Sequence, residues 1–220
     1  MPGTLYIVAT PIGNLEDITL RAISTLKTVD LIAAEDTRHT KILLDRYEIS
    51  KPATSYFAHS KIQKTEYIIS ILKEGKSVAI VSDAGTPGIS DPGYKIIRTA
   101  IDNGIAVVPI PGPSGLITAL TASGKPTDSF TFEGFLSNKS GKRKNQLKKL
   151  RDEGRTAVIY ESPHRILKTL DDILEVYGDI EIVLARELTK KFEEIRREKV
   201  SEAIMHFKPS QPKGEFIVVI

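Results

Sequence analysis

The chain has 220 residues, of which 40% are hydrophobic, with no cysteine and a formal net charge of +3. This composition is typical of a packed globular protein of one large or two small domains, and it excludes disulfides and thiolate zinc sites. No apolar run approaches the about 18 residues of a membrane span, and residues 1–4 lack the pattern of a signal peptide, so a cytoplasmic protein is expected.

Strands and helices are expected to alternate through the first half of the chain. Short apolar runs rich in β-branched residues predict buried strands, and leucine or isoleucine at helical spacing predicts helices. The expected strands are 5–9, 31–34, 53–57, 77–81 and 106–110, and the expected helices are 19–27, one beginning at residue 42, 62–72, 94–101 and 116–122. This alternation predicts a parallel sheet with helices on both faces.

Loops rich in glycine and proline follow three of these strands, at 10–14, 81–93 and 111–115. The middle loop is longer than the roughly 2–6 residues that a connection needs, which favours a binding loop over a surface turn. Ser90 or Asp91 is expected to cap the helix that follows it. Ligands bind at the carboxyl ends of the strands in open parallel sheets. Because the loops are poor in lysine and arginine and lack Gly-x-Gly-x-x-Gly, they favour a neutral or cationic nucleoside-like ligand.

The pattern restarts after a linker at 125–128. The expected strands there are 130–135, 156–160, 180–185 and 214–220, the expected helices are 139–155, 166–174 and 201–204, and 193–200 is ambiguous, with an exposed strand as one reading. We therefore expect two α/β domains, 1–124 and 125–220, with a mostly parallel sheet in the first and a mixed sheet in the second.

Positive charge is concentrated in residues 139–155, which hold eight lysines and arginines and two acidic residues. Such a lopsided segment indicates a polyanionic partner, although a solvated helix face is the alternative.

Several motifs together resemble the tetrapyrrole-methylase family. They are residues 8–14, 34–38, 83–90 and 111–114 in the first half, and 161–165, 185–190 and 213–216 in the second. Within the family, the motifs are most similar to members that methylate a cytidine ribose 2′-oxygen in small-subunit ribosomal RNA. The resemblance covers nearly the whole chain, although members usually continue beyond the last strand. It implies a homodimer of two-domain α/β subunits, with S-adenosylmethionine in the cleft between the domains and RNA or an assembled small subunit as the partner.

The resemblance also assigns site residues. Cofactor binding is implied for Pro11, Gly13, Asp83, Gly85, Thr86, Pro87, Ile89, Ser114, Gly115, Tyr160, Ala185 and Gly214. The candidate catalytic residues, which lie beside strand ends, are Asp36, Glu161, Lys213 and Glu215, each with a helix cap or an ion pair as the alternative role. The candidate RNA contacts are Arg38, Lys142, Arg143, Lys144, Arg165 and Arg186. His39, His59, His164 and His206 show no metal-ligand spacing, so no metal is expected.

Two other functions remain open on the sequence alone. The same fold methylates carbon atoms of corrinoid precursors, and a non-catalytic RNA-binding or assembly protein could retain the fold. The basic segment 139–155 and the motif at 34–38 favour RNA as the substrate over a tetrapyrrole.

Overall fold

The computed structural model describes residues 1–56, 62–209 and 212–220, and it divides into two compact units. The first unit is Met1–Ser114 and the second is Gly115–Ile220. The boundary predicted from the sequence lies at residue 124, whereas in the structure the helix α5 (Gly115–Ser123) belongs to the second unit, where it packs on the strand β10 (Phe216–Val219). Position 57, at the end of the third expected strand, and His59 lie outside the described residues.

The first unit is built on a five-stranded sheet in which every strand is parallel to its neighbours. Its strands are β1 (Thr4–Val8), β2 (Leu31–Ala34), β3 (Ala53–Ser55), β4 (Val78–Val81) and β5 (Ala106–Ile110), in the order β3-β2-β4-β1-β5. Every residue of β2 and β4 is buried, as expected where both faces of a sheet are covered. The parallel sheet predicted from the sequence is confirmed.

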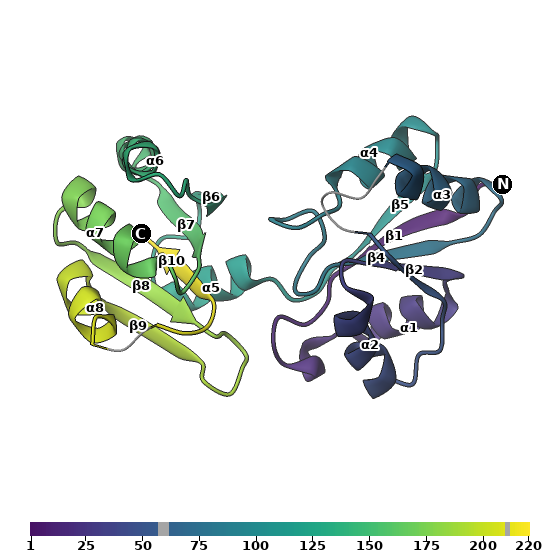
Figure 1. The fold of residues 1–220 in the computed structure, drawn as a ribbon, viewed down its shortest axis with the longest axis horizontal. Coiled ribbons are helices and arrows are strands. Elements are labelled where there is room, and N and C mark those ends of the chain that lie inside the picture. The colour runs from purple at the N-terminus through teal and green to yellow at the C-terminus, as the bar shows by residue number, and fades with distance from the viewer. Residues whose placement is uncertain (57–61, 210–211) are drawn as a thin grey trace. The chain divides into compact units, whose positions relative to one another are not determined.

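Helices cover both faces of this sheet (Figure 1). They are η1 (Leu15–Asp17), α1 (Leu20–Thr28), α2 (Thr37–Arg46), α3 (Ile62–Lys73) and α4 (Tyr94–Asp102). Side chains of α3 and α4 pack on one face of the sheet, and those of α1 and α2 pack on the other. The helix expected from residue 42 begins at Thr37, because Asp36 caps it. Ser90 and Asp91 do not cap α4, whose N-cap is Gly93 and has no side-chain hydrogen bond.

The second unit holds a mixed sheet, as predicted. Its strands are β6 (Phe130–Phe135), β7 (Thr156–Glu161), β8 (Glu181–Arg186), β9 (Glu194–Lys199) and β10, in the order β6-β7-β10-β8-β9. Only the β6–β7 pair is parallel. The ambiguous segment 193–200 supplies β9, which pairs with β8 along its whole length.

One face of the second sheet packs on α6 (Ser140–Glu153), α7 (Ile166–Tyr177) and α8 (Val200–Phe207). In Figure 1 these three helices lie along the same side of the sheet. The core between them includes Leu147 and Leu150 of α6 and Phe216 of β10, which are almost completely buried. Among the described residues, no helix is both long and apolar enough to cross a membrane.

Candidate functional site

The carboxyl ends of β2, β4, β1 and β5 lie next to one another at one edge of the first sheet. Two of the loops that leave this edge are bonded together, because Thr10 N–H donates to the Gly85 carbonyl at 2.9 Å and Gly85 N–H donates to the Thr10 carbonyl at 3.0 Å. The Thr10 hydroxyl also donates to the Ser82 carbonyl at 3.0 Å. The loops after β1 and β4 therefore form one connected surface.

Glycines let these loops approach each other closely. Gly85 is buried and has φ +79°, a conformation that favours glycine, and a Cβ there would lie 3.5 Å from Cγ2 of Ile12. In the loop after β5, a Cβ on Gly112 would lie 3.0 Å from Cβ of Ala9. The Thr86 hydroxyl donates to the Pro113 carbonyl at 3.5 Å, which attaches the third loop to the other two.

The structure thus brings together the eight first-unit residues for which sequence motifs imply cofactor binding. They are Pro11, Gly13, Asp83, Gly85, Thr86, Pro87, Ile89 and Ser114. Pro11 and Pro87 are buried, whereas Gly13 is exposed and Ile89 is 44% exposed. Pro11 and Pro87 therefore restrict the backbone of the loops from buried positions, whereas Gly13 and Ile89 are accessible to a ligand.

Carboxylates gather at the same edge. The carboxylate of Asp83 accepts a hydrogen bond from Asp36 N–H at 3.0 Å, and that of Glu35 accepts one from Asp83 N–H at 3.3 Å. Burial raises the pKa of Glu35, and the negative charge of Asp83 adds to the rise. Neither Glu35 nor Asp83 forms an ion pair within the part of the chain that the structure describes. This edge is therefore suited to a cation, and Glu35, which directly follows a strand, is a candidate site residue that was not predicted from the sequence.

Replacing Glu35 with glutamine is expected to stabilise the protein at neutral pH, because a half-buried charge is removed while an oxygen remains for Asp83 N–H. The folded-state pKa of Glu35 is raised, so its ionisation costs stability as the pH rises through that pKa. The stability advantage of Glu35→Gln should therefore vanish at pH values below the ordinary pKa range of a carboxyl group, where Glu35 is protonated in both the folded and the unfolded state. Urea unfolding of both proteins across this pH range would measure it. A stability difference independent of pH would show that ionisation of Glu35 is not its cause.

Asp36 and Arg38, predicted as a catalytic residue and an RNA contact, are bonded to each other. Asp36 caps α2 through the Arg38 N–H at 2.8 Å and accepts from the Arg38 guanidinium at 2.6 Å. The hydrogen bonds from Arg38 hold the pKa of Asp36 well below its usual range, so its carboxylate is a weak base. In the structure, Asp36 therefore has the alternative role considered from the sequence, that of a helix cap.

In the second unit, Tyr160, Gly115 and Ala185 lie around β10. The Tyr160 hydroxyl accepts a hydrogen bond from Leu116 N–H at 2.9 Å, and a Cβ on Gly115 would lie 3.4 Å from that hydroxyl. Ala185 is buried in β8, directly opposite Ile217 of β10. These three residues lie in one region of the second unit, and their part in cofactor binding stays a prediction.

A second group of hydrogen-bonded side chains joins the end of β8 to the start of β10. The Glu187 carboxylate accepts from Glu215 N–H and from the Lys190 ammonium, each at 3.0 Å, and Lys190 also pairs with the Glu215 carboxylate. Burial acts to lower the pKa of Lys190. Hydrogen bonds to Glu215 and Glu187 nevertheless hold that pKa above its usual value, so Lys190 is a cation. A Cβ on Gly214, at φ +89°, would lie 2.4 Å from Cγ of Glu187. Glu187 and Lys190 were missed because Glu215, which bonds to both of them, is distant in sequence.

Lys213 and Arg186 lie beside this group. The Arg186 guanidinium donates to the Lys213 carbonyl at 2.7 Å and pairs with Glu194 at 3.3 Å. The positive charge of Arg186 is therefore partly neutralised by Glu194 within the unit. The side chain of Lys213 is exposed, and its catalytic role stays a prediction.

Glu161 is placed in the interior, which contradicts its prediction as a catalytic residue. Its side chain is 0% exposed, and it accepts hydrogen bonds from the Thr169 hydroxyl at 2.6 Å and from Ser162 N–H at 2.8 Å. Arg165 lies 3.3 Å from this carboxylate and donates to the Leu136 carbonyl at 2.6 Å. Both side chains hold β7 to the start of α7, and the Arg165 side chain, which is 26% exposed, keeps its RNA contact as a prediction.

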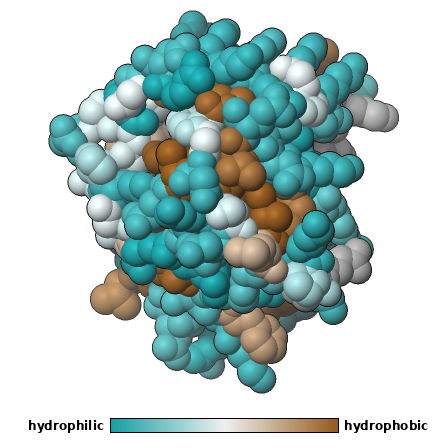
Figure 2. Space-filling view, turned by 90° about the vertical axis from the view of Figure 1, so that its left-hand side faces the viewer, coloured by the Kyte–Doolittle hydropathy of each residue, from teal (hydrophilic) through white to brown (hydrophobic). Residues whose placement is uncertain are grey.

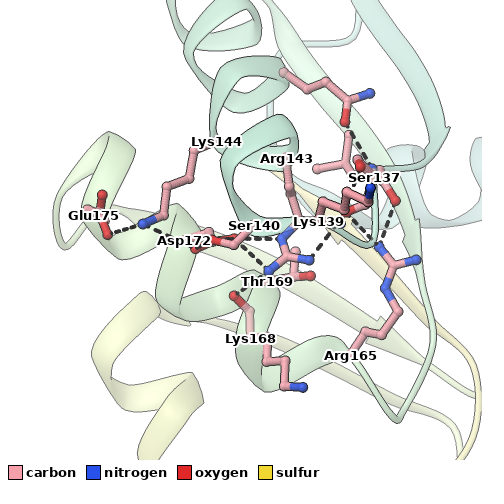
Figure 3. Close-up of polar contacts among 12 residues, drawn as sticks. Ser137, Lys139, Ser140, Arg143, Lys144, Arg165, Lys168, Thr169, Asp172 and Glu175 are labelled. Atoms are coloured by element: carbon pink, nitrogen blue, oxygen red, sulfur yellow. Dashed lines mark hydrogen bonds and ion pairs between the residues drawn. The ribbon is translucent and has the colours of Figure 1, made fainter.

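Arg143 is also interior, which corrects its prediction as an RNA contact. Its side chain is 3% exposed and pairs with Asp172 of α7 at 2.6 Å (Figure 3). Lys144 pairs with Glu175 and lies 3.7 Å from Asp172. Lys142 is exposed, and its contact with RNA stays a prediction. Within the described ranges, no group of three or more histidine or carboxylate residues is arranged to hold a metal ion.

Comparisons with known proteins identify the family. A family model described as tetrapyrrole (corrin/porphyrin) methylases matches residues 4–204. Ribosomal RNA small subunit methyltransferase I of Thermotoga maritima is 53% identical over 99% of this chain and 98% of its own length. The protein of the same name from Escherichia coli O157:H7 is 50% identical over 99% of this chain and 77% of its own length.

A solved structure, uroporphyrin-III C-methyltransferase of Thermus thermophilus complexed with S-adenosylhomocysteine, superposes with a TM-score of 0.69 at 16% identity. The match covers 99% of this chain and 97% of that one, and at this identity it shows the fold alone. Together with the two relatives and the family match, it leads to one assignment. The chain belongs to the tetrapyrrole (corrin/porphyrin) methylase family.

Proposed function

We propose that the protein transfers a methyl group from S-adenosylmethionine to a cytidine ribose 2′-oxygen of small-subunit ribosomal RNA in the cytoplasm. One observation carries the proposal: a relative named ribosomal RNA small subunit methyltransferase I is 53% identical over almost the full length of both chains. The cytidine and the 2′-oxygen come from the motif resemblance. A homodimer, implied by the same resemblance, stays a prediction.

The first unit has features that suit this methyl donor. S-adenosylmethionine carries a positive sulfonium, and Glu35 and Asp83 provide negative charge at the loop edge without an ion pair among the described residues. Gly85 and Gly88, at φ +79° and +87°, allow the loop after β4 a backbone conformation that residues with side chains rarely adopt. We therefore propose that the three loops hold the cofactor and that Glu35 and Asp83 attract its positive end.

When bound, S-adenosylmethionine supplies an electrophilic methyl group. The chain must then orient a ribose hydroxyl toward it, and alignment of reacting groups at about 3–3.5 Å supplies much of such a rate. Asp36 is a poor candidate for a general base, because its pKa is lowered by Arg38. Glu161 is buried and fully hydrogen-bonded. We therefore expect positioning to account for more of the rate than proton removal by either carboxylate.

The remaining site assignments also stay proposals. Gly115, Tyr160, Ala185 and Gly214 would contribute to cofactor binding, and Lys213 and Glu215 would lie near the reacting groups. Lys142 and the partly neutralised Arg38 and Arg186 would contact RNA phosphates.

Labelled S-adenosylmethionine and small ribosomal subunits from a strain that lacks this methylation would test the proposal. We expect label in the rRNA, and the methylated linkage should resist alkaline cleavage, because the 2′-oxygen is no longer a nucleophile. A gap in the hydrolysis ladder would locate it. Label in a base would contradict ribose methylation. Transfer to a uroporphyrinoid instead of RNA would show a tetrapyrrole methylase, and cofactor-independent RNA binding without transfer would show an assembly protein.

A further inference from the structure

The structure separates the positive charges of α6 into two sets. The first set faces α7. Arg143 pairs with Asp172 and donates to the carbonyls of Ser137 at 3.2 Å and Lys168 at 3.3 Å (Figure 3). Lys144 pairs with Glu175, and Arg151 donates to the Val176 carbonyl at 3.1 Å. These three cations are used to attach α6 to α7.

The second set is exposed and consists of Lys139, at the N-cap, with Lys142, Lys148 and Lys149. None of these four side chains forms an ion pair or a hydrogen bond with any residue that the structure describes. The acidic residues at the end of α6 pair with other cations in the structure, Asp152 with Arg151 and Glu153 with Arg155. The unpaired charge on this helix is therefore all positive.

Burial of Arg143, Leu147 and Leu150 fixes which side of α6 these lysines occupy. Lys142 and Lys149 are seven residues apart, so they lie on one side of the helix, about 10 Å apart along its axis. Gln146 lies between them on that side, and its side-chain oxygen accepts a hydrogen bond from Ser137 N–H at 2.9 Å. This contact and the Arg143–Asp172 pair hold the helix in one rotation, with Lys142 and Lys149 turned away from α7.

We infer that Lys142 and Lys149, with Lys139 beside them, form a phosphate-contacting surface for ribosomal RNA. The inference rests on the proposed function, and it replaces Arg143 and Lys144 as RNA contacts. Two lysines about 10 Å apart can meet different phosphates of one strand, whereas a solvated face would mix charges of both signs. The face of the molecule drawn in Figure 2 is mostly hydrophilic, with smaller hydrophobic areas.

A charge-matched pair of double variants would test this surface. Lys142→Ala with Lys149→Ala removes two cations of the second set, and Lys144→Ala with Arg151→Ala removes two of the first. Binding to protein-free small-subunit rRNA would be measured against salt concentration, without cofactor. We expect the first variant to lower the log–log slope by up to about 0.7 to 0.9 per lost contact. We expect the second to keep the wild-type slope and to lose thermal stability.

Three other outcomes of the binding experiment would contradict the inference, and each has a different explanation. An unchanged slope in the first variant would show that this side of α6 is a solvated face. Equal losses in both variants would show that net charge, not these lysines, decides binding. Weaker binding to assembled subunits but not to protein-free rRNA would indicate a ribosomal protein as the partner. Failure of the proposed function is seen separately, as the absence of methyl transfer by the wild-type protein.

Discussion

Replacing Gly85 with valine is expected to weaken S-adenosylmethionine binding at least about a hundredfold, which corresponds to about 2.8 kcal/mol. Gly85 has φ +79°, where a β-branched residue is strained, and its N–H and carbonyl both bond Thr10. Relief of that strain must rotate the peptide groups that join the loops after β1 and β4. Calorimetric titration with S-adenosylmethionine would measure the loss.

Gly104→Val is the matched control for this substitution. Gly104 has φ +67°, and a Cβ there would meet nothing within 4 Å, so valine strains the backbone to a similar degree far from the three loops. We expect Gly104→Val to lose some thermal stability and to keep wild-type affinity. If Gly85→Val is folded by circular dichroism and still binds the cofactor normally, the loop after β4 does not belong to the cofactor site.

Replacing Arg143 with alanine is expected to destabilise the protein by about 3–5 kcal/mol. The Arg143 side chain is 3% exposed and that of Asp172 is 8% exposed. Removal of the guanidinium leaves the Asp172 carboxylate buried with the Ser140 hydroxyl and the more distant Lys144 as its remaining partners. An uncompensated buried charge is far more costly than a lost surface pair. Urea unfolding followed by circular dichroism would measure the change.

Lys142→Ala, one residue earlier on the same helix, provides the control. Its side chain is exposed and unpaired among the described residues, so we expect a change within about 0.5 kcal/mol. Removing Asp172 together with Arg143 should cost less than the sum of the two single substitutions, because neither charge is then left alone. A loss below about 1 kcal/mol in Arg143→Ala would mean that this pair does not fix α6.

Much of the fold could be predicted from local patterns. The alternation of short apolar strands with helices predicted the parallel sheet of the first unit, because parallel strands need crossover helices that bury both faces. The glycine and proline loops could be assigned to one edge for the same reason, and the bonds between Thr10 and Gly85 join two of them. The start of α2 was misplaced by five residues, because its early positions are polar and its cap, Asp36, was considered for catalysis.

The sequence by itself determined the family motifs, both sheet types and the concentration of positive charge in residues 139–155. Only the tertiary structure decided what each charged side chain does. Arg143 and Lys142 are adjacent and both positively charged, yet Arg143 is buried against Asp172, 29 residues further along, and Lys142 is exposed. Glu161 and Glu187 likewise have partners set by neighbouring strands and helices. The electrostatic energy of a side chain depends on burial and on charges brought near it by folding, and local sequence specifies neither.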